Sequence, residues 1–284
     1  MKEKEATTLR PTTPTDLPTI LEIHRHSLPL HTHALFTNPF RHLHPTSYAL
    51  FTLVSPTNKL STPPSPHSQS LTITTTTSKD TPTSWAFWRR NTGPLHSSKI
   101  QQYKTTASSI TSGQTPISSL IPIKEEGTKY KSLSLPRLSL CNLHTLHDTL
   151  KYFASEHYYL SHLLVHPDHK RKGFGTILTL WGLYHAAKEG LPVFLTASTE
   201  GEGLYKKLGF RVIGEKSFPG IEELSEEDRR REEEILGKEV VEEQFRIVER
   251  PKIMVWEGTV EDEIFKDEEV IRMILAVPWD IQEV

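Results

Sequence analysis

The chain has 284 residues, a formal net charge of −2, 36% hydrophobic residues, 20 prolines and one cysteine. This length suits one large domain or two small ones, and the lone Cys141 excludes an internal disulfide. No apolar run is long enough to cross a membrane, and the charged N-terminus lacks the apolar core of a signal peptide. We therefore expect a cytoplasmic protein, with the nucleus as an alternative, and no membrane partner.

The near-neutral total hides an uneven distribution of charge. From Ile221 onward the chain carries nine Lys/Arg and 21 Asp/Glu, a net charge of −12, which leaves +10 for the preceding part. A basic part of this kind suits a polyanionic small ligand. It has no interleaved basic and aromatic residues, so we expect no nucleic-acid partner.

The first predicted elements are a strand over 8–11 and a helix that begins at Asp16. Thr15 is a suitable cap for that helix, and Pro18 falls in its first turn. Residues 29–47 are predicted to be irregular, and residues 55–68 form a Ser/Thr/Pro surface loop. Alternation at 71–73, a turn at 79–82 and the apolar residues at 85–87 together predict a hairpin.

A long Ser/Thr/Pro-rich insertion is predicted over 91–136, mobile in part. Helical spacing of apolar residues follows over 138–153, where Cys141 is expected to be a buried thiol rather than a reactive one. Residues 158–165 read as a central strand. This strand leads directly into the most informative segment of the chain.

Residues 163–175 join this apolar strand to a basic turn and then to a helix. Lys170, Arg171 and Lys172 precede Gly173-Phe174-Gly175, and free N–H groups at a helix start favour an anion such as a diphosphate. A tight turn with solvated lysines would have the same pattern. The dinucleotide fingerprint fails because Leu178 stands at its third glycine, and the P-loop fails because Thr176 follows Gly175 without a lysine.

Further elements follow in a regular order. The helix after the turn stops at Gly190 and Pro192, a buried strand covers 193–197, a short helix covers 203–208 and a strand covers 210–213. Ser225 begins a charged helix through Glu243, which is either a solvated face or a lid or partner surface. A final strand is predicted over 253–256.

Four parts of the sequence follow one another in a recognisable order and spacing. They are 9–11 with 16–18, Val165-His166-Pro167-Asp168, 170–175 and Leu204-Tyr205-Lys206-Lys207-Leu208-Gly209-Phe210. This succession resembles the GNAT superfamily of N-acetyltransferases, and the segment 190–198 is similar to a form common in fungal members. Lys170 stands where the family usually has Arg or Gln, and Ser198-Thr199-Glu200 stands where many members have Asn.

The resemblance implies an α/β (α+β) fold with a mixed, mostly antiparallel central sheet flanked by helices. It implies one N-acetyltransferase domain over 7–257, with insertions at about 55–68, 91–136 and 217–250. Residues 258–284 are expected to be a C-terminal extension.

It also implies acetyl-CoA as co-substrate and direct attack by a primary amine in a ternary complex. The pyrophosphate would be held by Lys170, Arg171, Lys172, Gly173, Phe174, Gly175 and Thr176, and Ser198 would join the cofactor site. The backbone of Leu163, Leu164 and Val165 would pair with the pantetheine arm.

In this reading Tyr205 is the general acid that protonates the departing thiolate. Glu156 is the first candidate for the general base, while Glu200, His157, His162 or a water chain remain alternatives. No metal site is expected, because the histidine pairs 24/26, 31/33 and 42/44 lack converging further ligands.

Two other functions stay open at this point. The chain could be a non-catalytic acyl-CoA-binding sensor or scaffold. It could also be a protein or histone acetyltransferase, with the acidic stretch 222–243 attracting a basic peptide. The sequence does not identify the acceptor or the oligomeric state.

Overall fold

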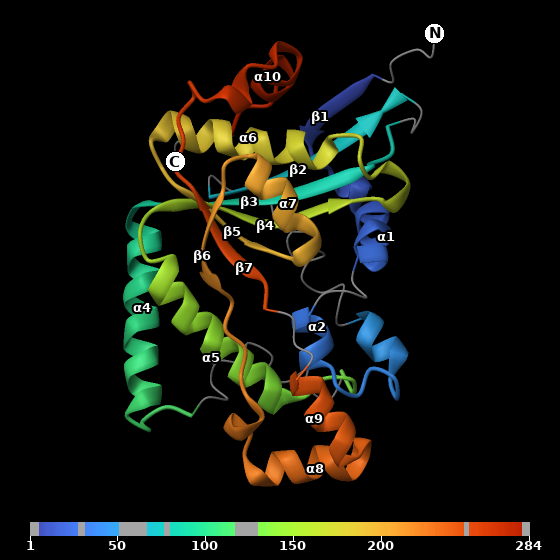
Figure 1. Cartoon of the computed structure of the whole chain (residues 1–284), viewed down its shortest axis with the longest axis vertical. Coiled ribbons are helices and arrows are strands. Elements are labelled where there is room, and N and C mark those ends of the chain that lie inside the picture. Colours follow the sequence, from blue (N-terminus) through green and yellow to red (C-terminus); the bar gives the residue numbers. More distant parts are fainter. Residues whose placement is uncertain are drawn as a thin grey trace.

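The fold centres on one mixed sheet. The computed structural model describes residues 6–27, 32–50, 67–76, 80–116, 130–246 and 250–279. These residues form a seven-stranded sheet in the order β1-β2-β3-β4-β5-β7-β6 (Figure 1). Only the pair β4–β5 is parallel. The strands are β1 Thr7–Pro11, β2 Ser68–Thr75, β3 Ser84–Asn91, β4 His157–Val165, β5 Val193–Ala197, β6 Arg211–Glu215 and β7 Lys252–Trp256. The predicted α/β architecture is therefore confirmed.

Helices cover both faces of this sheet. Figure 1 shows α6 (Phe174–Glu189) and α10 (Glu268–Leu275) on one face. On the other face lie α1 (Leu17–Ser27), α4 (Gly93–Thr111) and α5 (Leu135–Tyr152). Side chains alternate between the faces along a strand. Leu160 of β4 accordingly joins the core beneath α6, while Leu164, after an irregularity in the strand, packs with Ile20 of α1.

The core between the sheet and α6 is closely packed. The indole N–H of Trp88 donates to the carbonyl of Leu178 at 3.2 Å. A Cβ added to Gly182 would lie 2.3 Å from the Trp88 ring, so only glycine allows α6 to lie this near β3. Trp181 stacks on Trp279 and donates its indole N–H to the Val277 carbonyl at 2.7 Å. The segment predicted as an extension thus completes the core as far as Trp279.

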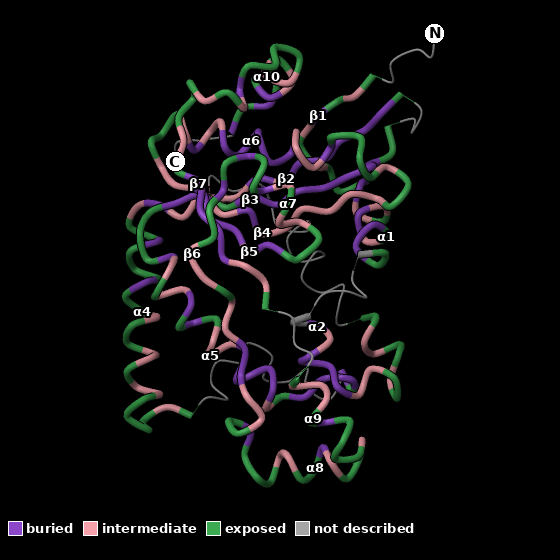
Figure 2. The backbone as a smooth tube through the Cα atoms, viewed as in Figure 1, coloured by how far each residue is buried: buried purple, intermediate pink, exposed green. Residues whose placement is uncertain are grey.

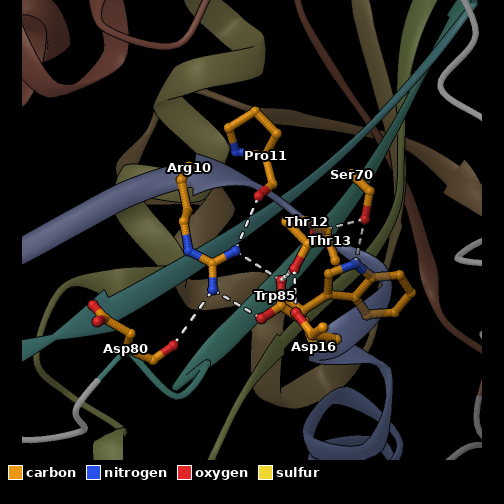
Figure 3. A network of polar contacts seen from close by, with 9 residues as sticks. Arg10, Pro11, Thr12, Thr13, Asp16, Ser70, Asp80 and Trp85 are labelled. Atoms are coloured by element: carbon orange, nitrogen blue, oxygen red, sulfur yellow. Dashed lines mark hydrogen bonds and ion pairs between the residues drawn. The ribbon is translucent and has the colours of Figure 1, made fainter.

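A polar network joins β1 to the first helices (Figure 3). The two terminal nitrogens of the Arg10 guanidinium each donate an N–H to one carboxylate oxygen of Asp16, at 2.7 and 2.8 Å. Asp16 also accepts from the backbone N–H of Thr13 at 2.7 Å. Burial acts to raise the pKa of Asp16, but the bonds from Arg10 and Thr13 outweigh it and the pKa is lowered. The cap is therefore Thr13 at the start of a 3-10 turn, Pro14–Asp16, and not Thr15.

Three regions differ from the predicted elements. The expected irregular insertion contains the 19-residue helix α4, whose Ile100 and His96 are buried. The region 29–47 contains α2 (Thr32–Thr37). The helix predicted at 203–208 is α7 (Thr199–Lys207), which begins earlier because Ser198 caps it. Residues 51–66, which hold nearly all of the predicted loop at 55–68, lie outside the described residues.

The acidic segment forms two helices rather than one, α8 (Glu226–Leu236) and α9 (Lys238–Arg246). They separate at Gly237, which has a φ of 89°. Figure 2 shows most of this hairpin exposed, but Glu232 is buried and accepts from Arg137 Nε of α5 at 2.8 Å. The Arg137 guanidinium also lies over the rings of Phe36 and Phe245. Removing either partner would leave a buried charge uncompensated.

Candidate functional site

The central feature of the site is the edge at which β4 and β5 separate. β4 pairs with β3 along its whole length, but with β5 only from Tyr158 to Leu160. A register shift in the β3 pairing leaves Ser161 without a partner on that strand. The backbone of the following residues, Leu163 to Val165, is therefore unpaired on the β5 side. The buried Ser161 hydroxyl also has no hydrogen-bond partner among the described residues.

The basic turn ends where α6 begins beside this edge. Gly173 precedes the helix with a φ of 86° and offers no side-chain cap. The bond from the Ile177 N–H to the Gly173 carbonyl, at 3.1 Å, closes the first turn of α6. Helix geometry therefore leaves the N–H groups of Phe174, Gly175 and Thr176 without acceptors inside the helix. Arg171 also adopts a positive φ, 65°, which is uncommon for a non-glycine residue.

The charges of the turn are distributed unevenly. Lys170 Nζ lies 2.6 Å from Glu200 Oε1 on α7, and both side chains are largely exposed. Lys172 Nζ lies 3.4 Å from the Nδ1 atom of His169. The exposed Arg171 has no ion-pair partner among the described residues. The turn thus brings three cations to a helix N-terminus, of which Lys170 pairs with Glu200, and this set suits a pyrophosphate.

Gly175 brings three elements of the site together. A Cβ at this position would lie 3.3 Å from Leu204 Cδ2 of α7 and 3.7 Å from Leu163 Cδ2 of β4. The start of α6 therefore approaches the unpaired edge of β4 and the helix α7 closely. Ser198, at the start of α7, accepts a bond from the Gly201 N–H at 3.3 Å. Its role in cofactor binding stays a prediction.

Tyr205 is a buried residue of α7, with 7% of its surface exposed. Its ring packs edge-on against Phe210 and beside Gly201, where a Cβ would lie 3.1 Å from the ring. Burial raises the pKa of Tyr205 above its ordinary value, and the nearby Tyr159 raises it further. The hydroxyl is therefore protonated at neutral pH and can act as a proton donor.

Glu156, the first candidate for the base, caps a helix. Its carboxylate accepts the backbone N–H of Gly93 at 2.5 Å, at the start of α4. It precedes β4, whereas Val165 ends that nine-residue strand. At roughly 3.3 Å per residue the two ends are more than 20 Å apart. The structure does not bring Glu156 close to the C-terminal edge of β4.

The other base candidates are also engaged. His157 donates from Nδ1 to the Ser155 carbonyl at 2.7 Å, so its Nε2 accepts from the Asn91 amide at 2.9 Å. Burial lowers the pKa of His157 to about 4. His162 packs beside Trp85 and His24 on the α1 face. Glu200 pairs with Lys170 at the turn, as described above.

Sequence reasoning missed one polar pair. The hydroxyls of Tyr159 and Thr196 lie 3.1 Å apart, one residue from the last β4–β5 pairing at Leu160 and Leu195. Alternation along β4 places Tyr159 on the face opposite Leu160. The sequence alternation could therefore have shown which face Tyr159 is on. It could not have shown that Tyr159 lies beside Thr196 of the neighbouring strand.

Two further features bear on the chemistry. Burial raises the pKa of Cys141 to about 12, in agreement with the predicted unreactive thiol. Within the described ranges, no group of three or more His, Cys, Asp or Glu side chains is arranged to hold a metal ion.

None of the helices described in the structure is both long and apolar enough to cross a membrane.

Comparison with known proteins centres on the same segment. Residues 143–212 match the family model described as an acetyltransferase (GNAT) domain. An acetyltransferase from Stachybotrys chartarum is 38% identical over 56 residues, which are 20% of this chain and 24% of that relative. The match therefore spans about a quarter of the curated relative.

Alignments with solved acetyltransferases cover most of this chain at low sequence identity. A structure described as histone acetyltransferase HPA2 and related acetyltransferase, from Corynebacterium glutamicum, is 14% identical and has a TM-score of 0.49. The alignment covers 91% of this chain and 99% of that one. The polyamine N-acetyltransferase of Drosophila melanogaster is 14% identical with a TM-score of 0.48, covering 89% of this chain and 100% of that one.

The sequence match at 143–212 contains the unpaired edge of β4, the basic turn, the start of α6 and Tyr205. This segment of the chain matches the GNAT acetyltransferase domain.

Proposed function

We propose that this chain transfers an acetyl group from acetyl-CoA to a primary amine by direct attack within a ternary complex. The observation that carries the proposal is the juxtaposition at Gly175. There the side chains of Leu163 on β4 and Leu204 on α7 lie within 4 Å of the Cβ position of Gly175, at the uncapped start of α6.

The residues fit the two recognisable parts of acetyl-CoA. The N–H groups of Phe174 to Thr176, with the guanidinium of Arg171, suit the pyrophosphate. The unpaired backbone of Leu163 to Val165 suits an arm that carries amide groups, which would add to β4 like a further strand. The orphaned Ser161 hydroxyl offers a polar contact along the same edge.

The reaction needs one bond made, one broken and one proton supplied. The amine nitrogen bonds to the thioester carbonyl carbon as the bond from that carbon to sulfur breaks. Tyr205 gives its proton to the departing sulfur and later regains one from solvent. Tyr205 is protonated at neutral pH and so has a proton to give, while burial raises its pKa and makes it a weaker acid than an exposed tyrosine.

Loss of the amine proton is assigned to water rather than to Glu156. Glu156 is engaged as a cap of α4, and both ring nitrogens of His157 are engaged in hydrogen bonds. Hydroxyls of Tyr159 and Thr196 lie beside the end of the β4–β5 pairing and could order such water.

The test is release of free CoA thiol from acetyl-CoA over a panel of primary amines, with the product identified by its mass gain. We expect saturable, amine-dependent release for at least one class of amine. Saturable CoA binding with no release on any small amine or basic peptide would contradict the proposal and favour the acyl-CoA sensor. Release only with a basic peptide would favour the protein acetyltransferase.

A further inference from the structure

The α4–α5 side of the sheet contains a cavity that the proposed cofactor site does not use. Its volume is about 220 Å³, and its walls come from α4, α5 and the facing strands. Residues that bring charge or hydroxyl groups to it include Arg89, Lys99, Asp148, Tyr159, Thr196 and Lys216. A water occupies about 30 Å³ of liquid, so this space suits a small molecule.

The charge of the cavity is positive and incompletely balanced. Among the described residues, Asp148 is the one carboxylate that lines it, and both of its oxygens accept hydrogen bonds from Ser217, from the backbone N–H at 3.0 Å and from the hydroxyl at 2.8 Å. Within the same described ranges, Lys216 donates only to the Thr145 hydroxyl, at 3.1 Å. Arg89 has no hydrogen bond from its side chain and no ion pair among the described residues. An anionic ligand group would complete this set.

The cavity also reaches the place where β4 and β5 separate. Arg89 and Tyr159 are register partners on β3 and β4, so their side chains lie on the same face. Tyr159 bonds Thr196 across the β4–β5 pair, and both line the cavity. The Tyr159–Thr196 end of the cavity therefore lies one residue from the last β4–β5 pairing, at Leu160 and Leu195.

A second hollow extends the cavity between α4 and α5. Its volume is about 550 Å³, and it shares Tyr103, Thr145 and Thr149 with the first. Most of its remaining lining residues are hydroxyl or amide side chains. This groove suits a polar, extended group rather than an apolar tail.

We propose that this cavity is the acceptor site, and that the acceptor is a small amine that also carries a carboxylate or phosphate group. The amine lies at the Tyr159–Thr196 end, and the anionic group is bound by Arg89 and Lys216. This inference rests on the proposed acetyl transfer for its orientation, but the ligand class follows from the cavity alone.

The experiment compares two matched pairs of amines that differ in the anionic group. These pairs are lysine with cadaverine, and O-phosphoethanolamine with ethanolamine. Binding to the full chain is measured by calorimetry, with and without CoA, and turnover by thiol release. We expect the anionic member of at least one pair to bind at least tenfold more tightly. The pair that responds identifies whether carboxylate or phosphate is preferred.

Two variants locate the effect. Arg89→Gln is expected to abolish most of the preference for the anionic amine, while Arg230→Gln on the exposed surface of α8 leaves it intact. Equal binding of anionic and neutral members to the wild-type chain would overturn the inference, whether or not turnover is seen. An Arg89-dependent preference in binding without thiol release would support the site and contradict the acetyl transfer.

Discussion

The two faces of the central sheet differ in how they are filled. On the α6 face, Trp88, Trp181 and Leu178 are fully buried, and Gly182 leaves no space for a single methyl group. On the α4–α5 face, buried polar groups such as His157 and Asp148 border a cavity. Both faces are built on the same strands, so the difference arises from alternate residues of one sequence.

This contrast separates two tasks. The close-packed face fixes the position of α6, because a closely packed core has little free space into which a helix could shift. It therefore also fixes the position of the N–H groups at the start of α6. The polar face places charged and hydroxyl groups where a second molecule could be recognised. Tyr205 belongs to the core of the α6 face, on a helix that packs beside Leu163 of β4 at Gly175.

Tyr205→Phe tests the proposed proton donor, which lies in the core of the α6 face. We expect kcat to fall on the order of 100-fold, with little change in affinity for acetyl-CoA, because only proton donation is lost. Tyr184→Phe on α6 is the matched control and should retain activity. Steady-state kinetics and CoA titration measure both. Unchanged kcat in Tyr205→Phe on a verified acceptor would remove the assignment.

His157 makes the polar face sensitive to acid. Because its folded pKa is lowered from 6.5 to about 4, the unfolded chain takes up a proton first as the pH falls. The contribution of neutral His157 to the free energy of unfolding is fully present above pH 6.5. It is lost as the pH falls through about 4, a change on the order of 3 kcal/mol. His157→Gln should lower the free energy of unfolding at pH 7 and reduce its loss between pH 7 and 4.5, both measured by denaturant unfolding. The exposed His147→Gln is the control and should keep the wild-type pH dependence. A wild-type pH dependence in His157→Gln would contradict the prediction.

Gly182→Ala tests the close packing of the α6 face. The added methyl would meet the Trp88 ring, and we expect a loss of about 1–3 kcal/mol of unfolding free energy. Gly203→Ala on α7 is the matched control, because no atom lies within 4 Å of its Cβ position. That change should stabilise by up to about 1 kcal/mol, since alanine favours a helix. Similar melting temperatures for the two variants would argue against a rigid α6 face.

The basic turn is tested by removing Arg171 and Lys172 together. We expect the Kd for CoA to rise on the order of tenfold at low ionic strength, and less in high salt, because exposed charges are screened. The double variant of Arg230 and Arg231 on α8 removes the same net charge elsewhere. If that pair weakens CoA binding equally, the turn has no special role.

The smallest expected effect concerns Glu200. It neutralises Lys170 through an exposed ion pair, which is worth at most about 1 kcal/mol. Glu200→Gln should therefore strengthen CoA binding by up to about fivefold, as Lys170 becomes free. Glu202→Gln, which breaks the neighbouring pair with Lys206, should have no effect on CoA. Weaker binding in Glu200→Gln would indicate that Glu200 orients Lys170 instead.

Local patterns in the sequence determined much of this architecture. The strand at 158–165, the Gly-x-Gly turn and the stop at Gly190 depend on neighbouring residues and backbone preference, which are readable in order. The same applies to the buried strand at 193–197. The family resemblance added acetyl-CoA and Tyr205, which spacing alone would not identify.

Only the tertiary structure decided the rest. The Ser/Thr-rich composition of α4 did not predict a helix. This helix is stabilised by packing on α5 rather than by the helix propensity of its residues. Glu156 directly precedes β4 in the sequence, which is why we expected it near the site. The extended backbone of β4 instead separates it from the C-terminal end of that strand. The meeting of Arg89, Tyr159 and Lys216 around one cavity joins residues more than 50 positions apart. Such contacts depend on how strands pair and helices dock, and no local pattern contains that information.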